Sequence, residues 1–307
     1  MNMPRVKQSS MVERAHALWN AAFHGRRDEV EDLLNAGADF EYLCSWATPL
    51  EGEGYSSDAL MAAACKGNIT IMTLLLHFGA DPTAVNPVGY TALHFATQHN
   101  RVAAVKLLLA NHADVTQTDR IGMNATHIAV ILGHCDVLVE LLLEDEADIN
   151  VGHYRSALPL LHMAVNKGQM QSLEILLQHD ADHSIENRHG RSALHYAVRR
   201  TYNTNVVTAV TIMLEHGFDV DEVDMLTGQR PLHWAVGTGN TNLTNLLVAA
   251  SANIEAPDWD GYRPLHHASV KGWANTVQIL MDQGADILST LAPPLNLLDP
   301  LTLNPKP

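Results

Sequence analysis

The chain has 307 residues, and 47% of them are hydrophobic, so it has the apolar surface that a folded protein needs and is not disordered by composition. The net charge of −15 argues against general nucleic-acid binding, because contact with phosphates needs a basic surface. The apolar stretches are too short to cross a bilayer, and three widely spaced cysteines are typical of a fold without disulfide bonds.

The first residues carry two basic side chains with no apolar run after them, so we expect an N-terminal tail over 1–12 and no secretory signal. A helical pattern begins at about residue 13. In 17–25, apolar residues recur at helical spacing and a glycine follows. A similar segment surrounds Met61, which occupies the position that Trp19 occupies in the first segment, 42 residues earlier.

Six later segments repeat one phrase, in which a histidine follows a short apolar stretch at a helix start. Successive histidines are 33, 35, 33, 38 and 33 residues apart, and Met61 lies 33 residues before the first of them. A Leu-Leu run follows the phrase, and then a turn of small residues and aspartate. The histidines are His94, His127, His162, His195, His233 and His266. A recurring period of this length predicts a repeat protein.

Each repeat predicts two short helices. The phrase begins with a polar residue followed by Pro or Ala, which suits the first turn of a helix, and a glycine such as Gly133 or Gly168 ends it. The second helix carries a leucine stripe, as in 137–142. Neither helix can bury its apolar face alone, so we expect the repeats to stack into a solenoid.

The opening phrase, the Gly-Ala-Asp turn and the 33-residue step closely resemble the ankyrin repeat. The resemblance implies an all-α ankyrin-repeat solenoid of helix-turn-helix units with short β-hairpin connections. Arg230 and Arg263 replace the usual threonine, and we expect them to loosen the local hydrogen bonding without ending the repeat. The expected repeat domain is 13–290, with eight units at about 13–46, 54–86, 87–119, 120–152, 155–187, 188–223, 226–258 and 259–290.

Two insertions interrupt the period. One lies between Cys44 and Ser57 and the other near 201–205, and a tolerated surface insertion explains them better than a functional loop. The Pro- and Leu-rich C-terminal tail, 291–307, contains five prolines, which exclude a long helix. We expect 291–298 to be a strip that covers the last repeat, with a disordered end or a binding motif as alternatives.

The histidines invite a metal-site interpretation, which we reject. They recur once per repeat, so we expect a ladder in which each bonds the backbone of an adjoining turn. No His-Glu-x-x-His motif is present, and the adjacent His266 and His267 should point to different faces of a helix. Cys65 is expected to face the surface beside Lys66, as an incidental thiol rather than a nucleophile. We therefore expect no metal, no cofactor and no catalytic residue.

Ankyrin partners usually contact the hairpin tips and the exposed ends of the first helices, and the resemblance places the candidate binding residues there. Nine of the 19 basic residues map to such positions, against one of the 34 acidic residues. This pattern predicts a basic binding face on an acidic protein, unless acidic residues simply prefer the outer helices. The candidate residues are Tyr90, Arg120, Ile131, Leu132, Arg155, Lys167, Arg188, Arg191, Arg199, Arg200, Trp259 and Tyr262.

These positions predict a non-catalytic scaffold or adaptor that binds a protein partner along its concave face. Arginine pairs well with carboxylates and aromatic rings supply apolar anchors, so we expect an acidic segment with some apolar residues. An accessory or regulatory role in a biosynthetic pathway and a ubiquitin-ligase substrate adaptor are the alternatives; an enzyme or a nucleic-acid binder is less favoured. We expect a cytoplasmic or nuclear monomer with no small-molecule substrate and no membrane insertion.

Overall fold

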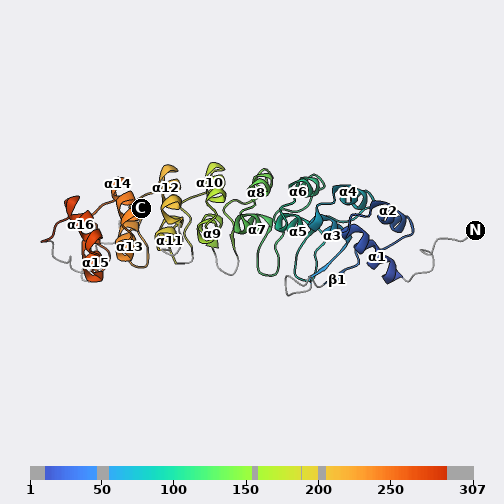
Figure 1. The fold of residues 1–307 in the computed structure, drawn as a ribbon, viewed down its shortest axis with the longest axis horizontal. Coiled ribbons are helices and arrows are strands. Elements are labelled where there is room, and N and C mark those ends of the chain that lie inside the picture. The colour runs from blue at the N-terminus through green and yellow to red at the C-terminus, as the bar shows by residue number, and fades with distance from the viewer. Residues whose placement is uncertain (1–10, 47–54, 154–157, 188, 200–204, 289–307) are drawn as a thin grey trace, which may run out of the picture. The chain divides into compact units, whose positions relative to one another are not determined.

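A computed structural model describes residues 11–46, 55–153, 158–187, 189–199 and 205–288. The described residues form sixteen helices that follow one another in pairs, with turns or very short strands between the pairs (Figure 1). This arrangement confirms the all-α repeat architecture predicted from the sequence. The chain divides into two compact units, unit 1 at 1–155 and unit 2 at 156–307.

Unit 1 contains four helix pairs and three short strands. The first helices are α1 (Met11–Phe23), α3 (Ala59–Lys66), α5 (Ala92–Gln98) and α7 (Ala125–Leu132). The second helices are α2 (Arg27–Asn35), α4 (Ile69–His77), α6 (Val102–Leu109) and α8 (Cys135–Leu142). The strands are β1 (Cys44–Trp46), β2 (Tyr55–Ser57) and β3 (Gly152–His153).

Unit 2 also contains four pairs, after the strand β4 (Leu158–Pro159). The first helices are α9 (Leu160–Lys167), α11 (Ala193–Arg199), α13 (Pro231–Thr238) and α15 (Pro264–Lys271). The second helices are α10 (Met170–Gln178), α12 (Val206–Glu215), α14 (Thr241–Ala249) and α16 (Ala274–Asp282).

Within each unit the first helices pack side by side in one row and the second helices in another (Figure 1). The close approach of the first helices depends on one alanine per repeat, two residues after the histidine position. All eight of these alanines are completely buried: Ala21, Ala63, Ala96, Ala129, Ala164, Ala197, Ala235 and Ala268. A larger side chain there would overpack the interface between neighbouring repeats.

The histidine of each phrase links its own repeat to the next hairpin. In α5, the backbone N–H of Thr91 donates to Nδ1 of His94 at 3.1 Å, and Nε2 of His94 donates to the carbonyl of Met123 at 3.2 Å. The second bond recurs in unit 2, from His162 to the carbonyl of Arg191 at 2.8 Å and from His233 to that of Tyr262 at 3.2 Å. The predicted role of these histidines as a framework ladder is confirmed at these positions.

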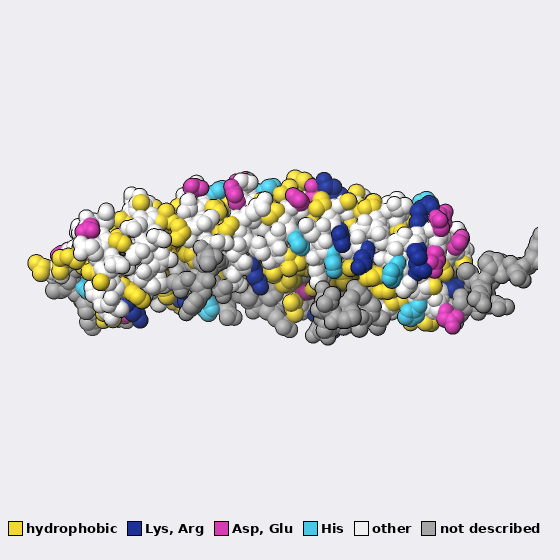
Figure 2. Space-filling view, viewed as in Figure 1, with side chains coloured by type: hydrophobic (Ala, Val, Ile, Leu, Met, Phe, Trp, Pro, Cys, Tyr) yellow, Lys and Arg dark blue, Asp and Glu magenta, His cyan; other side chains and the backbone are white. Residues whose placement is uncertain are grey.

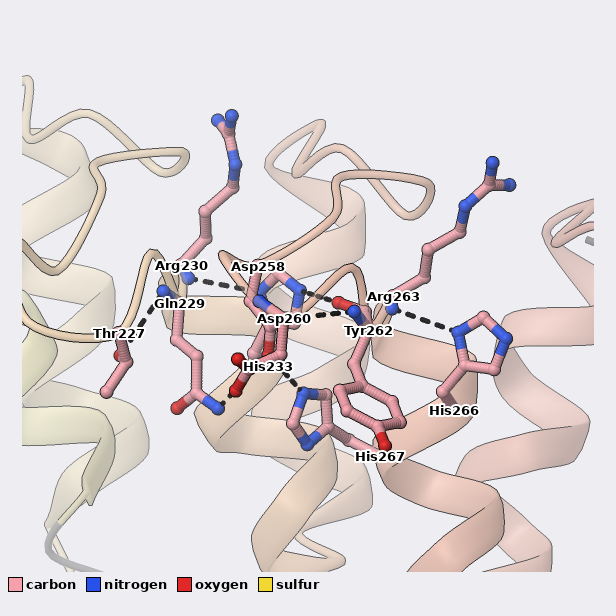
Figure 3. Close-up of polar contacts among 10 residues, drawn as sticks. All are labelled: Thr227, Gln229, Arg230, His233, Asp258, Asp260, Tyr262, Arg263, His266 and His267. Atoms are coloured by element: carbon pink, nitrogen blue, oxygen red, sulfur yellow. Dashed lines mark hydrogen bonds and ion pairs between the residues drawn. The ribbon is translucent and has the colours of Figure 1, made fainter. Parts of the chain in front are cut away.

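Arg230 and Arg263 keep the backbone bond that threonine makes elsewhere. Their N–H groups donate to Nδ1 of His233 and His266, both at 3.0 Å (Figure 3). What is lost is the side-chain cap, because neither guanidinium accepts from the helix. The Arg230 guanidinium instead donates to the carbonyl of Asp221 at 2.9 Å, so the expected loosening is confined to the missing cap.

Two repeats have no histidine at this position and replace its hydrogen bonds with other contacts. Nε1 of the buried Trp19 donates to Oγ of Ser57 at 2.9 Å, which replaces the histidine bond to the next repeat. Met61 has no such donor, but the buried Asp58 carboxylate caps α3 by accepting from the N–H of Met61 at 2.8 Å. Burial raises the pKa of Asp58 to about 7.

The first insertion begins and ends in paired strands. β1 and β2 run antiparallel, with Cys44 opposite Ser57, and residues 47–54 lie outside the described part. The second predicted insertion lies almost entirely outside it, at 200–204. The predicted covering strip, 291–298, also lies outside the described residues.

The bonding of His94 requires the neutral ring, because Nδ1 accepts an N–H while Nε2 donates. Burial also lowers the pKa of this histidine. Burial lowers the pKa of His162 and of His233 to about 4. The unfolded chain therefore binds protons that the folded chain excludes.

We predict that the free energy of unfolding falls as the pH drops from about 6.5 to about 4. Each such histidine contributes a slope of about 1.4 kcal/mol per pH unit. Asp58, whose folded-state pKa is raised, acts in the opposite direction over the same range and offsets part of the loss. Denaturant titrations at pH 7 and pH 5 measure the difference; equal stability at the two pH values would contradict neutral framework histidines.

His162 lacks one of the two framework bonds. The residue three positions before it is Pro159, which has no N–H, and Nδ1 of His162 has no hydrogen-bond partner among the described residues. We predict that Pro159→Ser, which restores the N–H and adds a capping hydroxyl, raises the free energy of unfolding by about 1 kcal/mol. Pro231→Ser is the control, since Pro231 sits one residue inside the phrase. A gain no larger than the control's would mean that Nδ1 does not limit stability.

Candidate protein-binding surface

The hairpin tips are shaped by a buried Asp or Asn in front of each phrase. Oδ1 of Asp258 accepts from the N–H of Asp260 at 3.1 Å and of Tyr262 at 2.8 Å, and the Asp258 N–H donates to the carbonyl of Tyr262 at 2.9 Å (Figure 3). One side chain thus fixes the backbone of the whole tip. Asn86, Asp119, Asn187 and Asp224 occupy the same place in other hairpins. Their spacing from the phrase was a signal that the sequence interpretation did not use.

Neighbouring tips in unit 2 pack on one another through glycine. The indole of Trp259 lies against Gly228, where a Cβ would overlap the ring. The backbone N–H of Trp259 donates to the carbonyl of Thr227 at 3.2 Å. Met225 lies similarly over Gly190, at 3.0 Å from the position of a Cβ. The glycines therefore hold large apolar side chains in fixed positions on the tips.

Four large apolar side chains on these two tips are exposed. Met225 and Leu226 are 58% and 57% accessible on one tip, and Trp259 and Tyr262 are 38% and 37% accessible on the next. Large apolar side chains that are exposed on neighbouring tips often mark a protein-interaction surface. The sequence predicts Trp259 and Tyr262 as binding residues but does not single out Met225.

The residue after the histidine position changes character along the repeats. It is a buried apolar side chain in Phe95, Ile128 and Met163, but it becomes Tyr196, Trp234 and His267 in the last three repeats. Those three polar aromatic residues are only partly buried. Sequence interpretation missed this column, although the change of residue type was visible in the repeat alignment.

Two of the predicted arginines lie near Trp234, one of these three residues. The guanidinium carbons of Arg191 and Arg199 lie 5.3 and 5.4 Å from the centre of a Trp234 ring. Nε of Arg191 donates to Oδ2 of Asp224 at 2.8 Å, and Asp224 is completely buried. Arg191 is therefore a fixed, largely buried ion-pair partner, whereas Arg199 is exposed at the end of α11.

The other predicted residues in the described part fall at the expected kinds of position. Tyr90 stacks on His94 with ring centres 5.2 Å apart. Arg120 is exposed on a tip, and its backbone N–H donates to the carbonyl of Val88. At the helix ends, Ile131 is half-buried, while Leu132 and Lys167 are exposed. Arg155, Arg188 and Arg200 lie outside the described residues.

The expectation for Cys65 was wrong. Its side chain is buried, and Sγ lies 3.5 Å from Nε2 of His99. The cause is a contact between repeats, in which the residue before several of the second helices bonds a carbonyl near the end of the first helix of the preceding repeat, as Asn68, Arg101, His134 and Trp273 do. Nε of Arg101 donates to the Cys65 carbonyl at 3.1 Å, and this contact draws the helix end under the next repeat.

The acidic side chains visible in Figure 2 are unevenly distributed. Figure 2 shows them mainly along the edge formed by the second helices and beside α1 and α2, whereas Lys, Arg and His also lie nearer the middle of the visible face of unit 1. Glu140 on α8, for example, pairs with Lys106 on α6 at 2.9 Å. This distribution agrees with either interpretation of the charge pattern.

His267 and Asp258 form a polar contact of another kind. Nε2 of His267 donates to Oδ2 of the buried Asp258 at 2.8 Å, and the ring of His233 lies 5.4 Å away (Figure 3). Because the other oxygen of Asp258 shapes the hairpin, we assign this pair a structural role. No group of three or more His, Cys, Asp or Glu side chains that could hold a metal ion occurs in the described part of the chain. Among the helices described there, none is long and apolar enough to cross a membrane.

Stacked helix pairs, histidine bridges to the next hairpin and side chains presented on the tips define a helical-repeat protein. The family profile "Ankyrin repeats (3 copies)" matches four overlapping stretches, 18–119, 60–153, 127–224 and 202–290. The chain belongs to the ankyrin-repeat family. It is an ankyrin-repeat domain, a module typical of protein–protein interaction.

Among known proteins, the mouse B-cell lymphoma 3 protein homolog is 31% identical over 215 residues, which cover 67% of this chain and 47% of that protein. The palmitoyltransferase AKR1 of Lachancea kluyveri is 29% identical over 203 residues, which cover 65% of this chain and 27% of the enzyme. The chain thus spans less than half the length of these relatives. The solved ankyrin-repeat domain of Bcl-3 superposes with a TM-score of 0.65 at 27% identity, covering 72% of this chain and 97% of that one.

We predict that Gly228→Ala destabilises the chain more than Gly217→Ala. Both glycines have a left-handed backbone, with φ of +69° and +85°, so both variants should lose about 1 kcal/mol from the backbone. Only at position 228 does the new Cβ meet a side chain, Trp259, and this should cost about 1–3 kcal/mol more. Denaturant unfolding measures the difference, and equal losses would show that Trp259 does not rest on Gly228.

Proposed function

We propose that this protein is a non-catalytic scaffold or adaptor that holds a partner protein through an acidic segment with apolar residues. The surface that we assign to this role is the partner face of unit 2, defined as Met225, Leu226, Trp259 and Tyr262 on the tips, with Arg199 and Trp234 on the first helices. The observation that carries the proposal is a fixed set of exposed apolar tips together with Arg199, which has no ion pair among the described residues.

The physical argument is one of complementarity and rigidity. Large aromatic side chains and arginine are the groups that contribute most to protein interfaces. Here the tip backbone is held by Asp258 and by the framework histidines, so little conformational entropy is lost when a partner binds. An acidic partner is favoured because Arg199 has no acidic partner of its own among the described residues.

The relatives support a regulatory role for the complex. The solved domain of Bcl-3 is described as a unique member of the IkappaB protein family, and it covers most of this chain. The match to a palmitoyltransferase covers 27% of that enzyme, so we do not transfer its activity. We place the protein in the cytoplasm or nucleus and propose that it acts as a monomer.

Affinity capture from the native cells tests the proposal, with the full chain as bait. We expect the wild type to retain a protein that a Trp259→Ser/Tyr262→Ser variant loses. Leu143→Ser is the control, because Leu143 is equally apolar and 65% exposed but follows the second helix α8. The captured protein should then bind purified chain more weakly as salt is raised, since exposed charge pairs are screened.

Two results would contradict this function. If the double variant captures the same proteins in the same amounts as the wild type, the tips do not hold the partner. If the purified chain turns over a substrate without any added protein, the non-catalytic assignment is wrong.

A further inference from the structure

We infer that Arg199 and Trp234, steered by Arg191, form a recognition site for a single carboxylate of the partner's acidic segment. The inference rests on the proposed function and names the chemistry that gives it specificity. Trp234 stands in the second turn of α13, Arg199 ends α11, and Arg191 precedes α11 in the hairpin. The three residues therefore come from two neighbouring repeats of unit 2.

The two arginines have different roles. Arg191 is held by Asp224, so its side chain is only 11% accessible and its charge is already balanced. Arg199 is exposed and has no ion pair within the described residues. The site consequently carries one unbalanced positive charge, which matches the single negative charge of an Asp or Glu side chain.

Trp234 prepares Arg199 for binding. The guanidinium lies over the indole at 5.4 Å from the ring centre, which limits the conformations of a long side chain that would otherwise be free. A planar guanidinium held in this way offers two parallel N–H groups to a carboxylate and loses less entropy on binding. The guanidinium lies over the face of the indole and does not bond its N–H edge.

That polar edge is a second sign of an incomplete site. Nε1 of Trp234 is buried and has no hydrogen-bond partner among the residues that the structure describes. A buried donor without an acceptor is unfavourable. The carboxylate bound by Arg199 supplies this acceptor once the side chains that cover Nε1 give way.

A synthetic peptide tests the site without knowledge of the natural partner. The probe is acetyl-Phe-Glu-Leu-Glu-Phe-Glu-Leu-amide, compared with the same peptide carrying Gln for Glu. We expect the wild-type chain to bind the Glu peptide about tenfold more tightly than the Gln peptide, a ratio typical of one charge-assisted pair. We expect Arg199→Gln to reduce that preference to within about twofold.

The control is Lys271→Gln, because Lys271 ends α15 as Arg199 ends α11 and is also exposed, so the variant removes the same charge. It should keep the tenfold preference. In ¹⁵N spectra, the indole resonance that disappears in Trp234→Phe should shift with the Glu peptide and stay in place with the Gln peptide.

The inference is overturned if the wild type shows no preference for the Glu peptide, or if Arg199→Gln keeps the preference. It is also overturned if Lys271→Gln loses the preference to the same extent, since net charge alone would then explain it. These results leave the proposed function standing whenever the captured partner still depends on Trp259 and Tyr262. Loss of that dependence with the Glu preference intact would refute the function instead.

Discussion

The structure depends on one bridge, made by a neutral histidine between its own repeat and the next hairpin. In His94 and His233, Nδ1 accepts the N–H that opens the helix and Nε2 donates to the carbonyl of the following tip. Both histidine side chains are buried, and a buried donor or acceptor left unpaired costs more than the bond itself contributes. The bridge therefore fixes the spacing of the repeats, and the completely buried alanine two residues later sets how closely they pack.

The same bridge positions the proposed partner face. The carbonyls that accept from His162 and His233 belong to Arg191 and Tyr262, which are the residue that steers the carboxylate site and one of the exposed tip aromatics. The histidine binds the backbone carbonyl of each of these residues, and the side chain of the same residue lies in or beside the proposed partner face. The bond that Nδ1 of His233 accepts from Arg230 exists only while the ring is neutral, so the anchoring of the Tyr262 tip to its helix start is linked to pH.

The fold could be predicted from the sequence because the same pattern of histidine phrase, leucine run and turn recurs along the chain. The histidine spacing located the helix pairs, and even the irregular Trp19 kept a donor toward the next repeat. The site was harder to predict, because tertiary contacts decide which arginines are available. Sequence position cannot tell that Asp224 neutralises Arg191, that Arg101 draws Cys65 under the next repeat, or that Trp234 stacks with Arg199.

We propose that a partner lies on the tips and first helices of unit 2. Amide hydrogen exchange of the chain with and without its captured partner tests it most directly. We expect slower exchange on binding in the tips at 224–229 and 258–263 and at the end of α11, with little change in α14 and α16. Protection confined to those second helices, or to unit 1, would contradict it.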